Sequence, residues 1–333
     1  MSKDNNKKAP KIRFPGFTDD WEQRKFGDIT EIKSASRVHK EEWTNSGVPF
    51  YRSSDVMSAI NGTTNTKVFI SEELYEKLSS TSGKLEKGDV LVTGGGSVGN
   101  PYIVPNNEPL YTKDADLLWI KNNEKFDSYF IYEFFFSPVF RTYLESISHV
   151  GTIAHYTITQ LADTPIALPS IEEQKQIGAY FKNLDHLITL HQRKLEKLKE
   201  YKKGMLQKMF PKNGENVPKV RFPGFDGEWE ERKVSEITSS YSGGTPKAGT
   251  TEYYDGDIPF IRSGEIYSNT TELFITEEGL NNSSAKTVHI GDILYALYGA
   301  TSGEVSRAKL DGAINQAILA IIPNNEVNAD FLG

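Results

Sequence analysis

A nineteen-residue motif occurs twice in this chain, and the repeat restricts the possible architecture more than any other feature. Residues 11–29 read KIRFPGFTDDWEQRKFGDI and residues 219–237 read KVRFPGFDGEWEERKVSEI, with eleven identical positions at an offset of 208. A weaker echo follows in the same order, VPFYRS at residues 48–53 and IPFIRS at residues 258–263. A period of about 200 residues is too long for a solenoid, so the repeat indicates a duplicated domain.

Length and composition agree with two globular domains. The chain has 333 residues, of which 37% are apolar and 27 are glycine, and this is too long for one ordinary core. The absence of cysteine excludes thiolate metal sites, iron–sulfur clusters and cysteine nucleophiles. No apolar run approaches a membrane span, and the first residues, MSKDNNKKAPK, contain no hydrophobic stretch for export. We therefore expect a soluble cytoplasmic protein.

Within each repeat we expect an α+β fold with a curved β-sheet. Short strands mixed with helices, and turns rich in glycine and asparagine, are typical of this class. In the first repeat Ser71 is a predicted helix N-cap, and Pro138 interrupts a helical stretch. The predicted helices cover residues 72–78, 127–136 and 139–147, and the predicted strands cover residues 89–93, 116–121 and 165–168.

The repeated motif is itself predicted to be a structural latch at the entrance of each domain. Phe14, Phe17 and Trp21 would form a small aromatic cluster around the turn at Pro15 and Gly16. A phosphate-facing role for the basic residues of the motif is the alternative, but the latch explains the repeated aromatic residues better.

Residues 170–210 differ in kind, because they predict one long helix. Ser170 and Glu173 form a predicted capping box, and no proline follows before Pro211. Apolar residues then recur in alternating steps of four and three, which is the heptad pattern of a coiled coil. Forty helical residues would span ~60 Å, too long for a domain of this size, so the seam requires a partner. The seam comprises Ile177, Phe181, Leu184, Ile188, Leu195, Leu198 and Met205, with His191 and Lys202 as interruptions.

These patterns divide the chain into four predicted segments with uneven charge. They are a disordered tail (residues 1–10), a first domain (11–169), a spacer helix (170–212) and a second domain (213–333). The spacer carries ten basic and five acidic side chains within a chain of net charge −7. DNA binding would therefore have to use local basic surfaces, and the total charge leaves it open.

A domain, a long helix and a second such domain resemble the specificity (S) subunit of bacterial type I restriction–modification enzymes. The stretch LPSIEEQKQI at residues 168–177 is similar to the signature that opens the spacer helix in that family. The FPGF…W motif before each domain, and GGTP at residues 243–246 followed by IPF at residues 258–260, also resemble the family. The resemblance covers residues 11–333.

The resemblance implies a non-catalytic protein with two target recognition domains, each of which reads one half of a split double-stranded DNA sequence. Two antiparallel spacer helices would fix the distance between the half-sites and dock two methyltransferase (M) subunits. Restriction (R) subunits would join through the complex. S-adenosylmethionine would belong to the methyltransferase subunits, and ATP and Mg²⁺ to the restriction subunits. The chain itself would then hold no cofactor and no metal.

The second repeat departs from the family, because it ends at Gly333 and nothing in it corresponds to residues 171–210. We expect the second spacer helix to be missing here. The seam would then be covered by methyltransferase subunits or by the same helix of a second copy, in an antiparallel homodimer with twofold symmetry. In such a dimer the first domains would read an inverted-repeat sequence.

Two other functions stay open on the residues alone. The first is a metal-dependent nuclease or methyltransferase in its own right, and the second is a coiled-coil scaffold without DNA binding. GGGSVG at residues 94–99 matches a dinucleotide-binding pattern, but Asn100 and Pro101 follow where a helix would have to begin. No P-loop or H-E-x-x-H pattern occurs, and no acidic pair or triad is marked as catalytic.

For direct readout of DNA we expect polar side chains of turns and loops, which can form hydrogen bonds with base edges. Arg52 and Arg262 are equivalent in the repeat, so a shared structural salt bridge is an equally good interpretation of these two. In the first domain the candidates are Arg37, His39, Arg52, Ser53, Ser54, Ser97, Asn100, Lys113, Thr152 and His155. In the second domain they are Ser242, Thr245, Lys247, Arg262, Ser263, Tyr298 and Thr301.

Overall fold

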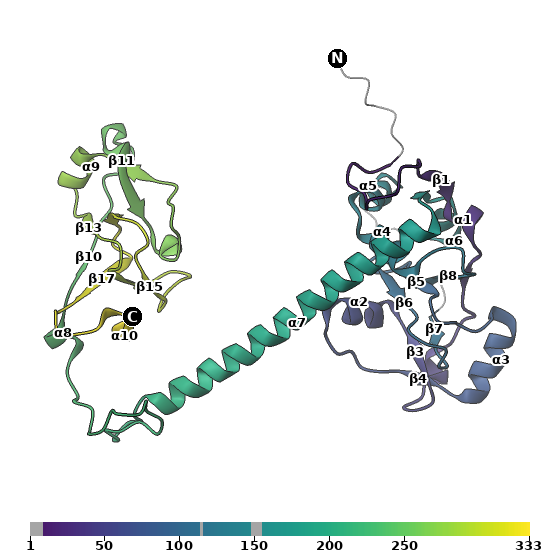
Figure 1. Ribbon diagram of the computed structural model, residues 1–333, viewed down its shortest axis with the longest axis horizontal. Coiled ribbons are helices and arrows are strands. Elements are labelled where there is room, and N and C mark those ends of the chain that lie inside the picture. Colours follow the sequence, from purple (N-terminus) through teal and green to yellow (C-terminus); the bar gives the residue numbers. More distant parts are fainter. Residues whose placement is uncertain (1–8, 114–115, 148–154) are drawn as a thin grey trace, which may run out of the picture. The chain divides into compact units, whose positions relative to one another are not determined.

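The chain forms two compact units that divide between Lys199 and Glu200. The computed structural model describes residues 9–113, 116–147 and 155–333 (Figure 1). Both units mix short strands with helices, as the α+β prediction requires.

The first unit contains two small sheets and a two-stranded ribbon. The larger sheet has the order β2-β8-β5-β6 and is antiparallel throughout, whereas the smaller one, β4-β3-β7, joins β3 and β7 in parallel. The ribbon pairs β1 with β9. The strands are β1 (Glu22–Lys25), β2 (Ile32–Ser34), β3 (Val48–Tyr51), β4 (Phe69–Ile70), β5 (Val90–Thr93), β6 (Pro101–Ile103), β7 (Tyr111–Thr112), β8 (Leu117–Ile120) and β9 (Pro165–Leu168).

The predicted helices of the first unit are confirmed, with small changes at their ends. The Ser71 hydroxyl accepts a hydrogen bond from the Leu74 N–H at 3.2 Å, as an N-cap should. Pro138 is the first residue of its helix, where a missing N–H costs nothing. The helices are α1 (Phe26–Ile29), η1 (Lys40–Glu42), α2 (Ser53–Asn61), α3 (Glu72–Ser82), α4 (Ser128–Phe136), α5 (Pro138–Ile147) and α6 (Ile158–Asp163).

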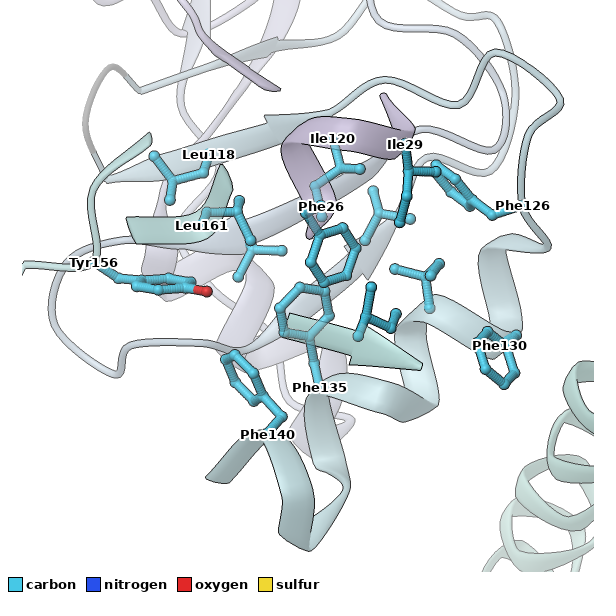
Figure 2. Close-up of a cluster of buried hydrophobic side chains, with 14 residues drawn as sticks. Phe26, Ile29, Leu118, Ile120, Phe126, Phe130, Phe135, Phe140, Tyr156 and Leu161 are labelled. Carbon is cyan, nitrogen blue, oxygen red and sulfur yellow. The ribbon is translucent and has the colours of Figure 1, made fainter. Parts of the chain in front are cut away.

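β5 and β8 are buried on both faces, and this explains why both read as uninterrupted apolar runs. Leu91 and Trp119 point to one core, and the alternate residues of the two strands point to another. Figure 2 shows the second of these cores, in which Phe26 stacks on Phe135 with ring centres 5.6 Å apart. The loops at the ends of these strands are thus held on a rigid, fully packed base.

The second unit repeats the topology of the two main sheets but has no counterpart of the β1–β9 ribbon among its described strands, so the predicted duplication is a duplication of fold. The sheet β10-β17-β14-β15 corresponds to β2-β8-β5-β6, and β12-β11-β16 corresponds to β4-β3-β7, with β13 added at its edge. The strands are β10 (Thr238–Ser242), β11 (Tyr254–Ile261), β12 (Phe274–Ile275), β13 (Lys286–Val288), β14 (Ile293–Ala296), β15 (Val305–Arg307), β16 (Gly312–Ile314) and β17 (Ile318–Pro323). The helices are α8 (Val234–Ile237), η2 (Thr251–Tyr253), η3 (Ser263–Glu265), α9 (Glu277–Asn281) and α10 (Ala329–Leu332).

One helix, α7 (Ile171–Met209), follows β9 and is the 39-residue spacer that the heptads predict (Figure 1). The Glu173 N–H donates to the Ser170 hydroxyl at 3.3 Å, which is half of the predicted capping box. The other half of the predicted box, a hydrogen bond from the Ser170 N–H to the Glu173 side chain, is wrong. The buried Glu173 carboxylate instead accepts two hydrogen bonds, at 2.8 and 2.6 Å, from Arg13. A charge-assisted pair is stronger than a neutral cap, so the distant arginine takes the carboxylate.

The repeated motifs, which we call the first latch (residues 11–21) and the second latch (residues 219–229), act differently from the prediction. Phe14 and Trp21 line one pocket, but their ring contacts are with other residues. Phe14 packs edge-on against Tyr180 of α7, and Trp21 packs edge-on against Phe130 of α4, both with ring centres 5.8 Å apart. The first latch therefore fastens the chain to two helices, because these offer more apolar surface than a short turn provides for itself.

Candidate nucleic-acid interface

In each unit two parallel strands end beside each other, and these strand ends form the floor of the candidate interface. The chain leaves β3 at Arg52 and β7 at Lys113, and the Lys113 N–H donates to the Tyr51 carbonyl at 2.9 Å. In the second unit β11 and β16 end in the same way, with the Asn315 N–H donating to the Ile261 carbonyl at 3.3 Å. The duplication therefore places equivalent chain segments at equivalent edges.

A hairpin loop lies next to each pair of strand ends. We call these the first hairpin loop (residues 94–100, between β5 and β6) and the second hairpin loop (residues 297–304, between β14 and β15). The Gly94 N–H donates to the Asp116 carbonyl at 2.7 Å, and the Leu297 N–H donates to the Ala317 carbonyl at 2.8 Å. The first hairpin loop enters a strand and not a helix, which removes the dinucleotide-binding interpretation.

Four of the predicted residues of the first unit gather at this loop. The Ser53 hydroxyl donates to the Asp116 carbonyl at 3.0 Å, and Lys113 pairs with the Asp116 carboxylate at 2.6 Å. His155 is exposed beside Gly95, where an added Cβ would lie 3.6 Å from the ring Nδ1 and 3.1 Å from Asp116 Oδ1. Ser97 is exposed within the loop. This cluster combines hydroxyls, an ammonium, a carboxylate and an imidazole, which together can donate to and accept from base edges.

Asn100 lies in the same loop, but its side chain shapes the loop. Its amide nitrogen donates to the Ser97 carbonyl at 2.7 Å, and its amide oxygen accepts from Arg141 at 3.3 Å. The Arg141 guanidinium lies 5.6 Å from the ring centre of Phe140, and burial lowers the pKa of Arg141. Sequence reasoning missed Arg141, because an arginine on an amphipathic helix gives no sign of which loop it supports.

Arg52 and Arg262 form the structural salt bridges that were the second interpretation of the repeat. Arg52 binds the Asp55 carboxylate at 2.9 Å and the Thr66 carbonyl at 2.7 Å. Arg262 binds Glu265 at 2.9 Å and Glu272 at 2.8 Å. The hydrogen bond from Arg262 is the main reason why the pKa of Glu265 falls to about 2. Both guanidinium groups hold the turn that follows a strand.

The remaining candidates of the first unit lie away from these contacts. Arg37 and His39 are exposed on either side of the buried Val38, in the segment before η1. The Ser54 hydroxyl accepts a hydrogen bond from Asn65 at 2.9 Å. Thr152 lies outside the described residues.

In the second unit the loop candidates form two contacts. The Thr301 hydroxyl donates to the Ser263 carbonyl at 3.3 Å, which ties the second hairpin loop to the end of β11. The Thr245 hydroxyl donates to the side-chain oxygen of Gln316 at 2.6 Å. Gln316 was not predicted, although it lies shortly after the end of β16. The other candidates, Ser242, Lys247 and Tyr298, are exposed.

No group of three or more histidine, aspartate or glutamate side chains is placed to hold a metal ion within the described part of the chain. No helix among the same residues is both long enough and apolar enough to cross a membrane.

Two copies of one α+β domain, each with polar loops on a rigid base, define a modular recognition protein. The family described as the type I restriction modification DNA specificity domain matches residues 18–200 and 226–333, and the chain belongs to this family. The family resemblance expected from the sequence is thereby confirmed. Membership gives no support to the nuclease, methyltransferase or scaffold alternatives.

Relatives and one solved structure agree with this family. The specificity subunit S.HindORF215P of Haemophilus influenzae is 27% identical over 170 residues, which cover 49% of this chain and 40% of that protein. The MjaX specificity subunit of Methanocaldococcus jannaschii is 25% identical over 330 residues, which cover 94% of this chain and 74% of that one. The S subunit of a type I system from M. genitalium shares the fold with a TM-score of 0.54 at 17% identity, covering 97% and 78% of the two chains. The chain thus spans less than half the length of the first relative.

Proposed function

We propose that this chain is the sequence-specific DNA-recognition subunit of a type I restriction–modification enzyme, and that each unit reads one half of a bipartite target. The observation that carries the proposal is the duplicated interface. The two hairpin loops are fixed by equivalent backbone hydrogen bonds, from Gly94 in one unit and Leu297 in the other, but carry different side chains. Two units that share one backbone arrangement but carry different loop side chains are suited to reading two different half-sites.

The chemistry at the two interfaces supports two kinds of readout. The first unit presents Lys113 and His155, whose nitrogen donors suit the acceptor edge of guanine. The second unit presents Thr245, Tyr298 and Thr301, which are neutral and can both donate and accept. The exposed Lys247, Arg37 and His39 are proposed to contact phosphates, which positions a domain without specifying bases.

Catalysis is assigned to partner subunits. Two methyltransferase subunits, which hold S-adenosylmethionine, would dock on the spacer helix, and restriction subunits with ATP and Mg²⁺ would join the complex. This chain would supply the target sequence and the half-site separation, and would act in the bacterial cytoplasm on double-stranded DNA.

The exposed seam of α7 supports the further proposal of an antiparallel homodimer. All side chains of residues 185–203 are exposed, and Ile188, Leu195 and Leu198 keep 54%, 52% and 54% of their surface in contact with solvent. Covering the exposed half of each such side chain stabilises an assembly by roughly half of the ~1.5–3 kcal/mol that complete burial contributes, which favours pairing of two copies. Methyltransferase subunits are the competing cover.

Selection from a random duplex library tests the recognition function. We expect the chain, alone or with methyltransferase subunits of a type I system, to enrich two short specified sequences separated by unspecified base pairs. A library that stays random in both conditions, while the chain remains folded, contradicts the proposal. Light scattering tests the homodimer: a dimer at micromolar concentration should become monomeric in Leu195→Glu, and a wild-type monomer excludes it.

A further inference from the structure

The two hairpin loops share a backbone arrangement but differ in their first two side chains. The Gly94 N–H and the Leu297 N–H donate to equivalent carbonyls, at 2.7 and 2.8 Å, so these two residues occupy equivalent positions. Gly95 and Tyr298 come next, and a glycine with positive φ follows them in both loops. The second unit therefore places two large side chains where the first unit has none.

In the first unit the chain itself covers this position. Gly94 and Gly95 are both buried. The Tyr156 N–H donates to the Gly94 carbonyl at 2.8 Å. A Cβ added at Gly95 would lie 3.1 Å from Asp116 Oδ1 and 3.6 Å from the Nδ1 of His155. The first unit thus has no room for a large side chain at Gly95, and the two interfaces differ in shape as well as in charge.

In the second unit the equivalent position is apolar and open. Leu297 keeps 38% of its surface in contact with solvent, and Tyr298 keeps 50%. Leu297 lies outside both apolar cores of this unit. Among the described residues, the Tyr298 side chain has no hydrogen-bond partner and no ring partner. Large apolar side chains that stay exposed together within a binding site indicate a contact with the ligand.

Hydrogen bonds within the second hairpin loop hold this pair in place. The Leu297 carbonyl accepts a hydrogen bond from the Ser302 hydroxyl at 3.2 Å, and the Ser302 N–H donates to the Gly299 carbonyl at 3.2 Å. At the base of the loop, the Gly303 N–H donates to the Ala296 carbonyl at 2.9 Å. A loop that is ordered before binding loses little entropy when its ligand arrives, so its side chains can discriminate between ligands.

The composition of the loop favours a base over a phosphate. Residues 297–304 contain no lysine or arginine, so they supply no charge to hold the DNA backbone. The only methyl group on the base edges of the major groove is the C5 methyl of thymine, and apolar side chains contact it. Leu297 is covered over most of its surface, so it does not project far enough to separate stacked bases. It can, however, lie against a methyl group that projects into the groove.

We propose that Leu297 and Tyr298 form an apolar contact that reads the C5 methyl group of a thymine in the half-site of the second unit. This inference rests on the proposed DNA recognition and names the base that one segment of the interface selects. The Thr301 hydroxyl of the same loop, which donates to the Ser263 carbonyl at 3.3 Å, can still accept a hydrogen bond from a neighbouring base edge.

Replacement of thymine by uracil tests the inference, because it removes the methyl group and leaves every hydrogen-bonding group of the base pair. The duplex selected by the chain, alone or with methyltransferase subunits, is synthesised with uracil in place of each thymine, one at a time. Fluorescence anisotropy at fixed salt measures the dissociation constants. We expect uracil at one position to weaken binding about three- to fivefold, which corresponds to one buried methyl group. Leu297→Ala should bind that thymine duplex and its uracil counterpart equally.

Ile290→Ala is the matched control variant. Ile290 precedes β14 and Leu297 follows it, and Ile290 is 66% exposed, so the control shortens an aliphatic side chain at the other end of the same strand. This variant should keep the difference in affinity between the thymine and uracil duplexes. Leu297→Met preserves the apolar volume and should keep most of that difference as well.

The outcomes separate this inference from the recognition function on which it rests. A wild-type chain that selects a bipartite sequence, but binds all thymine and uracil duplexes equally, overturns the methyl contact and leaves DNA recognition standing. A difference that persists in Leu297→Ala overturns the role of this residue. Unchanged DNA binding by Leu297→Ala, with loss of methyltransferase subunits from the complex in gel filtration, shows a protein contact instead and overturns the inference. A library that stays random contradicts both proposals.

Discussion

Arginines at the ends of β3 and β11 illustrate how a residue that recurs in both units can be structural. Arg52 and Arg262 each bind a carboxylate three residues later, and each contacts a second group on the following loop. The side chains that differ between the units, such as Lys113 and Thr301, are therefore better candidates for specificity than those that recur.

Replacement of Arg52 tests this assignment. Arg52→Ala should lower the free energy of unfolding by about 1.5–3 kcal/mol, because it leaves the mostly buried Asp55 without its charged donor. The matched variant Lys247→Ala removes an exposed cation and should leave the stability unchanged. Urea denaturation measures both. Equal stability of Arg52→Ala and the wild type would show that the pair is not structural.

Glu133 should make the first unit less stable as the pH rises. Burial, and then repulsion by Asp185, raise the pKa of Glu133 to about 7 in the folded chain. The folded chain therefore keeps the proton between the ordinary glutamate pKa and pH 7, whereas the unfolded chain loses it, and stability falls across that window. Below the window both states are protonated and the residue contributes no difference.

The substitution Glu133→Gln tests whether stability falls as the pH rises. The stability of the variant should equal that of the wild type near pH 4. It should exceed the stability of the wild type by a growing amount up to pH 7 and by a constant amount above pH 7. Thermal unfolding of both proteins from pH 4 to pH 8 measures the difference. A wild type that is more stable than Glu133→Gln at pH 8 would contradict the argument.

At the scale of elements, alanine substitutions at two glycines of α7 should have opposite effects on stability. A Cβ at Gly178 would lie 2.1 Å from Asp127 Oδ1, so α7 touches the start of α4 here. Gly178→Ala should destabilise the first unit by about 1–3 kcal/mol through overpacking. At Gly204 nothing lies within 4 Å, and Gly204→Ala should stabilise the helix by up to about 1 kcal/mol.

Urea denaturation of the two variants compares the same substitution in the same helix. The sign of the effect should differ between them. Tolerance of Gly178→Ala would contradict the contact between α7 and Asp127, and destabilisation by Gly204→Ala would contradict the open surroundings of Gly204.

Local elements could be predicted from the sequence, and long-range pairs could not. The cap at Ser71, the buried strands β5 and β8 and the spacer helix depend on neighbouring residues, and all are present. The contact between Arg13 and Glu173 joins residues 160 positions apart, and that between Asn100 and Arg141 joins residues 41 apart. Spacing patterns carry no signal for such pairs, which is why half of the capping box was predicted wrongly and why the hydrogen bond between Asn100 and Arg141 was not expected.

At the scale of the whole molecule, the duplicated fold makes the chain modular. Each unit has its own sheets, core and hairpin loop, built on the same strand order. Changes at the interface of one unit should therefore alter one half of the DNA target and leave the other half unchanged.

The most direct measurement is the DNA sequence selected from a random duplex library by three proteins: the wild type, Lys113→Ala and Thr301→Val. We expect a bipartite sequence for the wild type, relaxed preference in one half for Lys113→Ala, and relaxed preference in the other half for Thr301→Val. Each change should cost about 1–3 kcal/mol of discrimination at the affected position. Selection of a single uninterrupted sequence by the wild type, or loss of preference in the same half by both variants, would contradict this expectation.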